Sequence, residues 1–277
     1  MKRWSTRPLA VLSMVVAILI VSAGPVQANH AWSTYHWATT VTPFTLQLGN
    51  NMTGDWPPHL ATASADWSST AYDGQTDAFG TLVKNPLRTP VVAGASNRRC
   101  SATSGRVEVC NGKYGQNGWL GLAQIWLSNG HIVQGTAKMN DTYFNTSTYN
   151  NPNEKLHVVC QEVGHTFGLD HQDVSGASLN TCMDYFSNTG SNASSTASTH
   201  PNLHDYGQLT KIYNHNDGYN SYTAAAAASL LGAGGAAGAD GHGTPAGASP
   251  ARGSWYVQDL GNGRALVTHI YWADRGN

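Results

Sequence analysis

The sequence predicts an α+β domain, because a tight antiparallel hairpin and two capped helices follow one another along the chain. The hairpin turns at Asn129-Gly130, the first helix begins near Pro152, and the second covers 204–213. Asn-Gly between alternating apolar residues is a strong hairpin signal, and a polar cap before apolar residues at helical spacing marks a helix start. We expect these elements to share one core.

The first helix has a complete start signal. Asn151 is placed to cap it, Pro152 occupies the first helical position, and Glu154 is a capping-box acid. Two sets of side chains then recur at helical spacing, which predicts a buried helix with a polar seam. The apolar set is Leu156, Val159, Cys160, Val163 and Phe167, and the polar set is His157, Gln161 and His165.

The stretch from Gln161 to His171 differs by one residue from the pattern H-E-x-x-H-x-x-G-x-x-H. Residues four apart on a helix lie on one face, about 6 Å apart along the axis, so side chains at 161 and 165 can converge on one ion. Glu162 lies beside that point, where a carboxylate can activate a zinc-bound water. Gly168 permits a positive φ, which lets the chain turn and bring His171 back as a further ligand.

The hairpin and the second helix frame this motif. Residues 121–143 form the predicted hairpin, with Val133, Ala137 and Met139 facing the core and the alternate residues facing water. Asn202 and Asp205 can cap the second helix. Its inward face is Tyr206, Leu209 and Ile212.

With these motifs in place, the chain resembles the metzincins, and most of all their matrixin branch, over roughly 29–216. Thr181-Cys182-Met183-Asp184-Tyr185 supplies a candidate methionine turn after His171. The resemblance implies a zincin-like domain with a mixed, twisted sheet, an active-site helix, a Met-turn at Met183 and a closing helix. It also implies a Zn²⁺ cofactor. The Met-x-Tyr order further resembles the astacin and serralysin branches, which implies that Tyr185 can ligate the zinc or stabilise the oxyanion; the alternative is a buried tyrosine that packs under the helix.

The resemblance further implies the activity. The family adds an extended peptide substrate to a sheet edge near 121–143, so a polypeptide is the expected partner. Hydrolysis would use a metal-activated water with Glu162 as general base and acid.

Gln161 stands where the family has its first histidine ligand. An amide oxygen is a poorer zinc donor than imidazole, so we expect weaker binding by Gln161, His165 and His171. His157 is a possible substitute, but it lies about 12 Å from His165 along the axis. His131 and His204 are other candidates, for which a surface or capping role is favoured, and His200 is expected in a loop.

The N-terminus predicts export. Lys2, Arg3 and Arg7 precede an apolar run from Pro8 to about Val21, and Val26-Gln27-Ala28 ends in a small residue suited to cleavage. The alternative, an uncleaved anchor, is disfavoured because the run falls short of the roughly 20 residues that a span needs. We therefore expect a secreted monomer, cleaved after Ala28, with no stable membrane association. The net charge of −1 gives no basic footprint for nucleic acid.

Export makes disulfides the expected state of the four cysteines. Cys100 with Cys110 closes a short loop, which leaves Cys160 to pair with Cys182. The alternative is that Cys160 and Cys182 ligate zinc as thiolates, but they lack a Cys-x-x-Cys pair.

Four segments are predicted. Residues 1–28 are the signal peptide, and 29–218 form the metzincin-like peptidase domain. Residues 219–252 are an Ala/Gly-rich flexible linker with an alanine run that can be helical, and 253–277 form a C-terminal β-hairpin that turns at Leu260-Gly261-Asn262-Gly263. A lone hairpin is marginal in water, so we expect it to dock on the main domain or on a partner.

Two functions follow. The favoured hypothesis is a secreted zinc endopeptidase, because Glu162 has no evident structural purpose in an inactive protein. The alternative is a catalytically weak or inactive protein of the same fold that acts as an exported binding module, and Gln161 argues for it.

Overall fold

The computed structural model describes residues 1, 30–231, 244–248 and 253–273. Apart from Met1, the predicted signal peptide and its cleavage site after Ala28 lie outside these ranges. Among the described residues, no helix is both long enough and apolar enough to cross a membrane.

The described chain forms a mixed sheet of nine strands, which confirms the α+β class. Its order is β5-β3-β6-β8-β7-β11-β10-β9, with β1 beside β8, and a separate parallel pair joins β2 to β4. Strands β5, β3, β6 and β8 run parallel, whereas β7 is antiparallel to both of its neighbours. The strands are β1 (His36–Trp37), β2 (Phe44–Thr45), β3 (Leu48–Asn51), β4 (Leu87–Arg88), β5 (Val91–Ala93), β6 (Val107–Gly112), β7 (Trp119–Ser128), β8 (His131–Asn140), β9 (Thr244–Ala248), β10 (Gly253–Gly261) and β11 (Arg264–Trp272).

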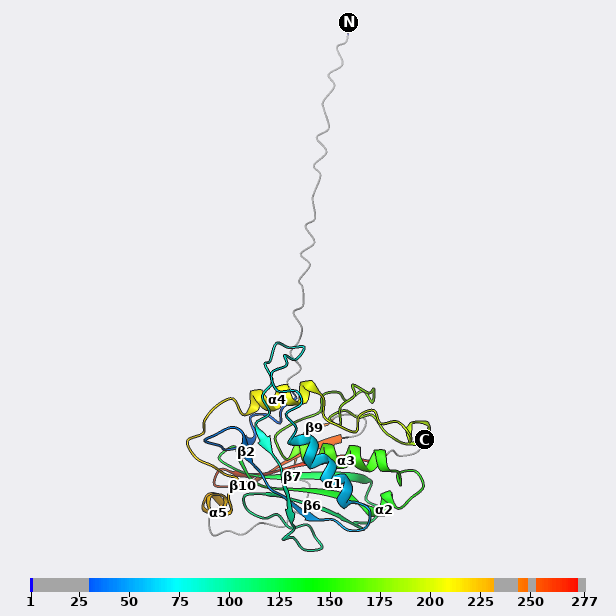
Figure 1. Ribbon diagram of the computed structural model, residues 1–277, viewed down its shortest axis with the longest axis horizontal. Coiled ribbons are helices and arrows are strands. Elements are labelled where there is room, and N and C mark those ends of the chain that lie inside the picture. The colour runs from blue at the N-terminus through cyan, green and yellow to red at the C-terminus, as the bar shows by residue number, and fades with distance from the viewer. Residues whose placement is uncertain (2–29, 232–243, 249–252, 274–277) are drawn as a thin grey trace.

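Helices α1 and α3 pack against each other and lie across one side of the sheet (Figure 1). The predicted start of α3 is confirmed, because the Asn151 side chain accepts a hydrogen bond from the Glu154 N–H. The capping box of α4, formed by Asn202 and Asp205, is confirmed as well. The helices are α1 (Pro57–Trp67), α2 (Asp141–Phe144), α3 (Pro152–His165), α4 (Leu203–Ile212) and α5 (Ala224–Leu231), with a 3-10 turn at Gly190–Asn192.

The main core lies between these helices and the sheet. Large fully buried side chains fill it, and from His157 to His165 every residue of α3 is buried, the polar seam included. Leu156, expected on the buried face, is only partly buried. The large buried side chains include Trp37, Trp67, Phe144, Phe167 and Tyr185.

The hairpin turn is confirmed, with Asn129 and Gly130 both at positive φ, but the expected water-facing side of β8 is wrong. Gln134 and Thr136 are 1% and 0% exposed. Helix α5 packs on β8, with Ala227 in the same apolar cluster as Val133. The register also shifts opposite Val133, which therefore packs with Trp126, Ala227 and Leu266 rather than with the main core.

The C-terminal hairpin is confirmed, and it docks on the main sheet. Strands β10 and β11 turn at Asn262-Gly263, and β11 pairs with β7 from Arg264 opposite Ser128 to Trp272 opposite Trp119. The sheet edge at which a peptide substrate was expected is therefore occupied by the chain itself. Within the predicted linker, α5 and β9 are described, while 232–243 and 249–252 lie outside the described residues.

Both predicted disulfides are present, Cys100–Cys110 and Cys160–Cys182. The alternative of zinc ligation by the thiolates of Cys160 and Cys182 is therefore wrong. The second bond ties α3 to the segment before Met183. Two disulfides are consistent with an extracellular protein.

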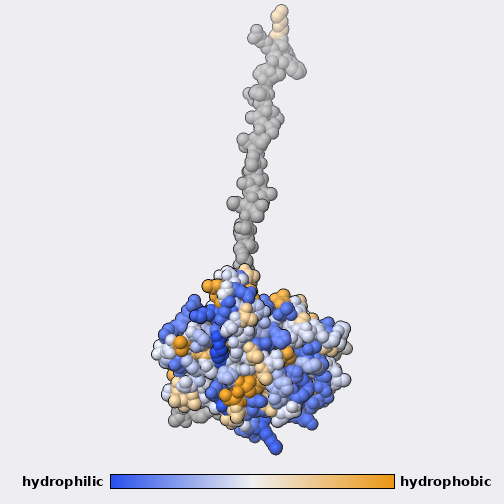
Figure 2. Space-filling view, in the orientation of Figure 1, coloured by the Kyte–Doolittle hydropathy of each residue, from blue (hydrophilic) through white to orange (hydrophobic). Residues whose placement is uncertain are grey.

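The face of the molecule in Figure 2 is largely hydrophilic, with small, separate apolar patches. Few large hydrophobic side chains of the described ranges are exposed, and they are scattered along the chain. Scattered apolar residues of this kind need no binding partner to explain them. They are Met1, Val41, Leu82, Val91, Val174 and Leu179.

Candidate metal centre

Three buried histidines meet beside α3. His165 is the last residue of α3, His171 follows the turn after it, and His269 comes from β11. One ring nitrogen of each lies within 4.8 Å of those of the other two. We call this group the histidine triad. Its members are 0%, 8% and 0% exposed, so it is enclosed by protein.

The turn that returns His171 to the helix depends on Gly168, as predicted. Gly168 has φ of +95°, and a Cβ there would collide with the Tyr35 carbonyl oxygen. Only glycine combines this backbone conformation with so close an approach. The sequence pattern therefore places His165 and His171 together for the expected physical reason.

Hydrogen bonds fix the tautomers of these two rings. His165 Nδ1 lies 2.8 Å from the Leu169 carbonyl oxygen, which can only accept, so Nδ1 carries the proton. His171 Nδ1 lies 3.2 Å from the Asp170 carboxylate and donates in the same way. In the neutral rings both Nε2 atoms are therefore unprotonated, and their lone pairs face each other across 3.1 Å. A cation between them would relieve this contact.

Burial keeps the triad neutral. It lowers the pKa of His165 well below its usual range, that of His171 to about 4, and that of His269 to about 3. Neutral imidazole is the form that binds a metal ion. A ligating histidine also commonly donates its other N–H to a carbonyl or carboxylate, as His165 and His171 do here.

Glu162 completes the centre. Its Oε2 lies 3.3 Å from His269 Nδ1, the Ala123 N–H donates to the carboxyl, and Oε1 is buried without a hydrogen-bond partner. Burial raises the pKa of Glu162 well above its usual range. The carboxyl presses against β7 at Gly121, where a Cβ would lie 2.6 Å from Oε1. The missing side chain at Gly121 makes room for Glu162.

Gln161 lies next to the triad in sequence, and its amide nitrogen is fully engaged. Nε2 donates to the carbonyl oxygens of Cys182 and Asp184, at 2.9 and 2.7 Å. Oε1 is buried without a hydrogen-bond partner. The amide oxygen is thus available to bind another group. Ligation of a metal ion by Gln161 stays a prediction.

Of the predicted Met-turn residues, Met183 lies beside α3 and Tyr185 beside the triad. Met183 packs against α3, where a Cβ on Gly164 would lie 2.7 Å from Met183 Sδ. The ring of Tyr185 lies 4.1 Å from that of His171, centroid to centroid. Both side chains are fully buried.

This close packing gives a first prediction. Gly164→Ala should lower stability, because its Cβ would also lie 2.7 Å from the rigid Trp67 ring. Overpacking costs about 1–3 kcal/mol, against a helix-propensity gain of at most about 1 kcal/mol. We expect Tm to fall by about 2–8 °C in a thermal melt. Gly112→Ala is the control, since its nearest contact would be 3.4 Å, and an equal fall in both variants would contradict the packing argument.

The other candidate histidines do not belong to the triad. His157 contacts Asn188 Oδ1 and the Asp184 carbonyl oxygen, and His204 packs on the ring of His30. His200 is half-exposed beside Asp66, and His131 belongs to a separate cluster.

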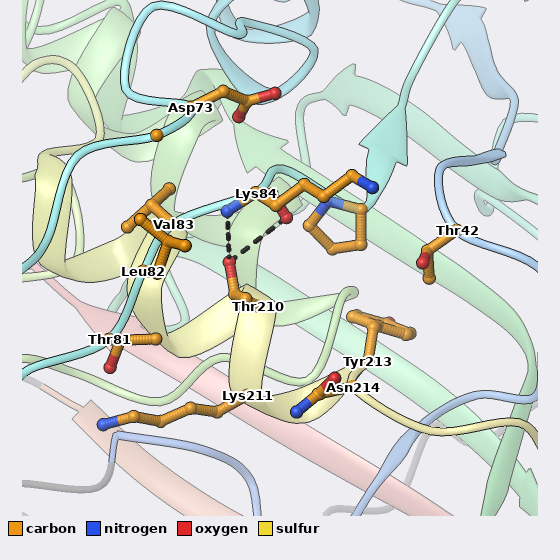
Figure 3. Close-up of a pocket in the computed structure, with 12 residues that line it drawn as sticks. Thr42, Asp73, Thr81, Leu82, Val83, Lys84, Thr210, Lys211, Tyr213 and Asn214 are labelled. Atoms are coloured by element: carbon orange, nitrogen blue, oxygen red, sulfur yellow. Dashed lines mark hydrogen bonds between the residues drawn. The ribbon is translucent and has the colours of Figure 1, made fainter.

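Aromatic rings from two distant segments cover the triad. Trp255 of β10 lies 4.6 Å from the His269 ring and 5.3 Å from the His165 ring, and Trp32 stacks on His165. An open groove of about 730 Å³ lies elsewhere, beside the Lys84 and Thr210 contact, and none of the triad residues lines it (Figure 3). The triad is closed by the C-terminal hairpin.

His269 was missed in the sequence, because it lies in the tail, far from the motif. Its only signal was a histidine among apolar residues of a predicted strand. No protein-family model matches the chain, and no curated protein is significantly similar to it. The candidate centre therefore rests on its geometry and on the motif.

Proposed function

We propose that this chain is a secreted, metzincin-like zinc endopeptidase whose centre is closed by its own C-terminal hairpin. One observation carries the proposal: His165 and His171 direct unprotonated Nε2 atoms at each other, beside Glu162. Imidazole donors in this number suit zinc. A protein that used these residues only for packing would gain nothing from two opposed acceptors.

The residues present fit the ion. Besides the two Nε2 atoms, the buried atoms without a hydrogen-bond partner include Gln161 Oε1, Glu162 Oε1 and His269 Nε2. Buried polar atoms are rarely left unpaired, and a bound cation is one explanation for such a group. When bound, zinc supplies Lewis-acid chemistry, polarising the peptide carbonyl and making water acidic enough to lose a proton near neutral pH.

The chain's own residues would do the proton transfer. Glu162 takes a proton from the attacking water and passes it to the nitrogen of the departing amine. Burial now raises the pKa of its carboxyl, and exposure to solvent with a nearby positive ion would restore the ionised form. Tyr185, whose ring lies next to that of His171, would donate a hydrogen bond to the developing oxyanion.

In this proposal the hairpin takes the position that a peptide substrate would occupy. β11 adds to β7 as an antiparallel strand, which is how an extended peptide binds a sheet edge. Displacing the hairpin would free that edge, remove His269 and Trp255, and release Glu162 from His269. Gln161 Oε1 would then be the third metal ligand. His269 would complete the metal site in the closed state, and Gln161 would complete it in the open state.

A second function is favoured by the burial of the triad. Three enclosed imidazoles can hold a structural zinc ion that clips the hairpin to α3, as in closed structural sites. The protein would then be an exported binding module without peptidase activity.

The decisive experiment compares the exported wild-type chain with Glu162→Gln and His171→Ala, by zinc content and by cleavage of casein. The peptidase predicts that Glu162→Gln binds zinc but loses about 10²–10⁴-fold in rate, because the general base is gone. His171→Ala should lose cleavage and the one zinc ion held at the triad. If that ion is present, as the difference in zinc content between the wild type and His171→Ala, but neither the wild type nor Trp255→Ala cleaves casein, the protein is the binding module instead.

A further inference from the structure

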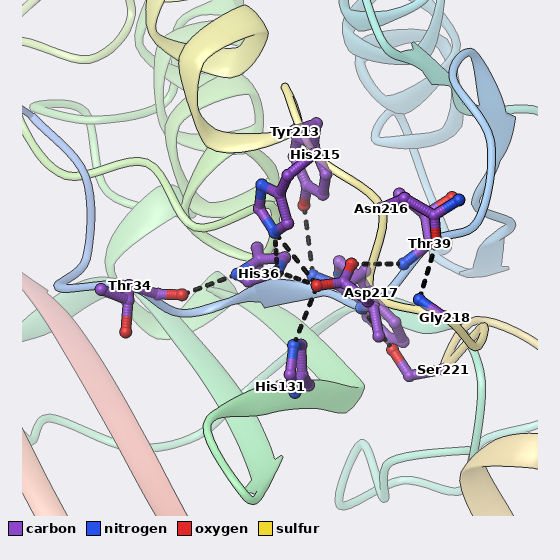
Figure 4. Close-up of polar contacts among 12 residues, drawn as sticks. Thr34, His36, Thr39, His131, Tyr213, His215, Asn216, Asp217, Gly218 and Ser221 are labelled. Atoms are coloured by element: carbon purple, nitrogen blue, oxygen red, sulfur yellow. Dashed lines mark hydrogen bonds and ion pairs between the residues drawn. The ribbon is translucent and has the colours of Figure 1, made fainter.

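A second group of metal-binding side chains lies away from the histidine triad. His36 comes from β1, His131 from the start of β8, and His215 and Asp217 from the loop after α4 (Figure 4). The Nε2 atoms of the three histidines lie 3.2, 3.2 and 3.0 Å from one oxygen, Asp217 Oδ1. Side chains from three distant segments thus converge on a single point.

The protons of this cluster do not satisfy every contact. His36 Nδ1 lies 2.7 Å from the Thr34 carbonyl oxygen and must donate to it, so Nε2 of the neutral ring carries a lone pair. That lone pair faces the Asp217 carboxylate, which also only accepts, and it lies 2.9 Å from His215 Nε2. Either an added proton or a cation would resolve the contact. Two imidazoles and one carboxylate aimed at the same point favour the cation.

We propose that His36, His215 and Asp217 bind a divalent transition-metal ion of the zinc class. Their donor atoms all lie within 4.8 Å of one another. Ligands of a tetrahedral zinc ion, at about 2.0–2.2 Å, are about 3.3–3.5 Å apart. The three distances here, 2.9, 3.0 and 3.2 Å, need to open by only a few tenths of an ångström.

The surroundings hold these donors in place. Asp217 Oδ2 accepts the Thr39 N–H at 2.8 Å, and His36 is oriented by its bond to Thr34. His131 contacts Asp217 Oδ1 through Nε2 and the Tyr219 hydroxyl through Nδ1, so it positions the carboxylate. Such outer contacts orient metal ligands.

The cluster is also reachable. The side chain of His215 is 45% exposed, while those of His36 and Asp217 are 11% and 7% exposed. An ion can therefore enter from solvent on the His215 side and complete its coordination with water. Bound there, it joins β1 to the loop after α4 and stabilises the fold by mass action. This site is independent of the peptidase proposal.

The test is the number and affinity of Zn²⁺ ions bound by the exported full chain, measured by native mass spectrometry and by competition with a chelator. We expect His215→Ala to bind one ion fewer than the wild type, with affinity at this site reduced at least about 100-fold. If the triad holds no zinc, the wild-type count falls from two to one, but the difference between the two proteins remains one.

Two variants keep the result interpretable. His200→Ala removes another exposed histidine paired with an aspartate, and should leave the zinc count unchanged. His36→Gln removes a second ligand, and should reproduce the loss of one ion. Equal zinc count and affinity in the wild type and His215→Ala would overturn the proposal. So would a cluster that takes up a proton but no zinc.

Discussion

Trp255→Ala should raise the rate of casein cleavage by the zinc-loaded protein about tenfold or more. Trp255 lies over the triad and against Trp32, so its removal weakens the docking of the hairpin. Truncating a fully buried tryptophan costs about 3–5 kcal/mol, and this half-buried ring should cost about 2 kcal/mol. Each 1.4 kcal/mol is about a factor of ten in the population of the open state. The rate with saturating zinc is the measurement.

The matched control is a variant that locks the hairpin in its docked position instead of weakening its docking. Gln124 and Thr268 are cross-strand partners on β7 and β11, and their side chains are hydrogen-bonded. Gln124→Cys combined with Thr268→Cys should form a disulfide that locks β11 in place and suppresses cleavage until it is reduced. A locked protein as active as the wild type would exclude any need for the hairpin to leave. The wild type under the same reductant corrects for effects on the native disulfides.

Local signals in the sequence predicted the elements around the centre. Asn151 fixes the start of α3, Gly168 its turn, and Asn129-Gly130 the hairpin, because each acts through its own backbone conformation or through neighbours a few residues away. The pairing of Cys160 with Cys182 followed from the small number of cysteines. In these places local preference and final fold agree.

Features that depend on distant segments were beyond the sequence. Nothing near β8 indicates that Gln134 and Thr136 will be buried, so the alternation of apolar and polar residues alone predicted a solvent-exposed face. Likewise, the tail pattern predicts β11 but not that it pairs with β7, because strand pairing between distant segments leaves no local mark. His269 reaches the triad only through that pairing.

The position of His269 changes how Gln161 is interpreted as a metal ligand. From the motif alone, Gln161 looked like a weakened ligand that either binds zinc or disables the centre. In the fold, His269 offers an imidazole at the same centre, and Gln161 is held by two carbonyl oxygens with Oε1 buried and unpaired. A histidine at 161 would compete with His269 for the ion. Under the proposed function, a weaker oxygen donor at 161 would let the closed state use His269, and Gln161 would couple metal binding to the position of the hairpin.

The second large effect is therefore expected in zinc affinity. In the wild-type background, His269→Ala should weaken zinc binding at the triad at least about 100-fold, because it removes one of three imidazoles, whereas Gln161→Ala should change it less than about tenfold. In the Trp255→Ala background, where the open state is more populated, the loss caused by Gln161→Ala should grow relative to the loss caused by His269→Ala. Chelator competition on the four variants measures both comparisons. All of these proteins also carry His215→Ala, so that only the triad is titrated.

The loss of the contact between His269 and Glu162 can be separated from the loss of a metal ligand. His269 also contacts Glu162, so His269→Ala leaves a buried carboxyl without that partner. His269→Gln keeps a polar side chain at the position, and should bind zinc more weakly than the wild type but melt closer to it than His269→Ala does. If Gln161→Ala weakens zinc more than His269→Ala in the closed protein, the amide oxygen is the resident ligand, and the tail covers the centre without entering it.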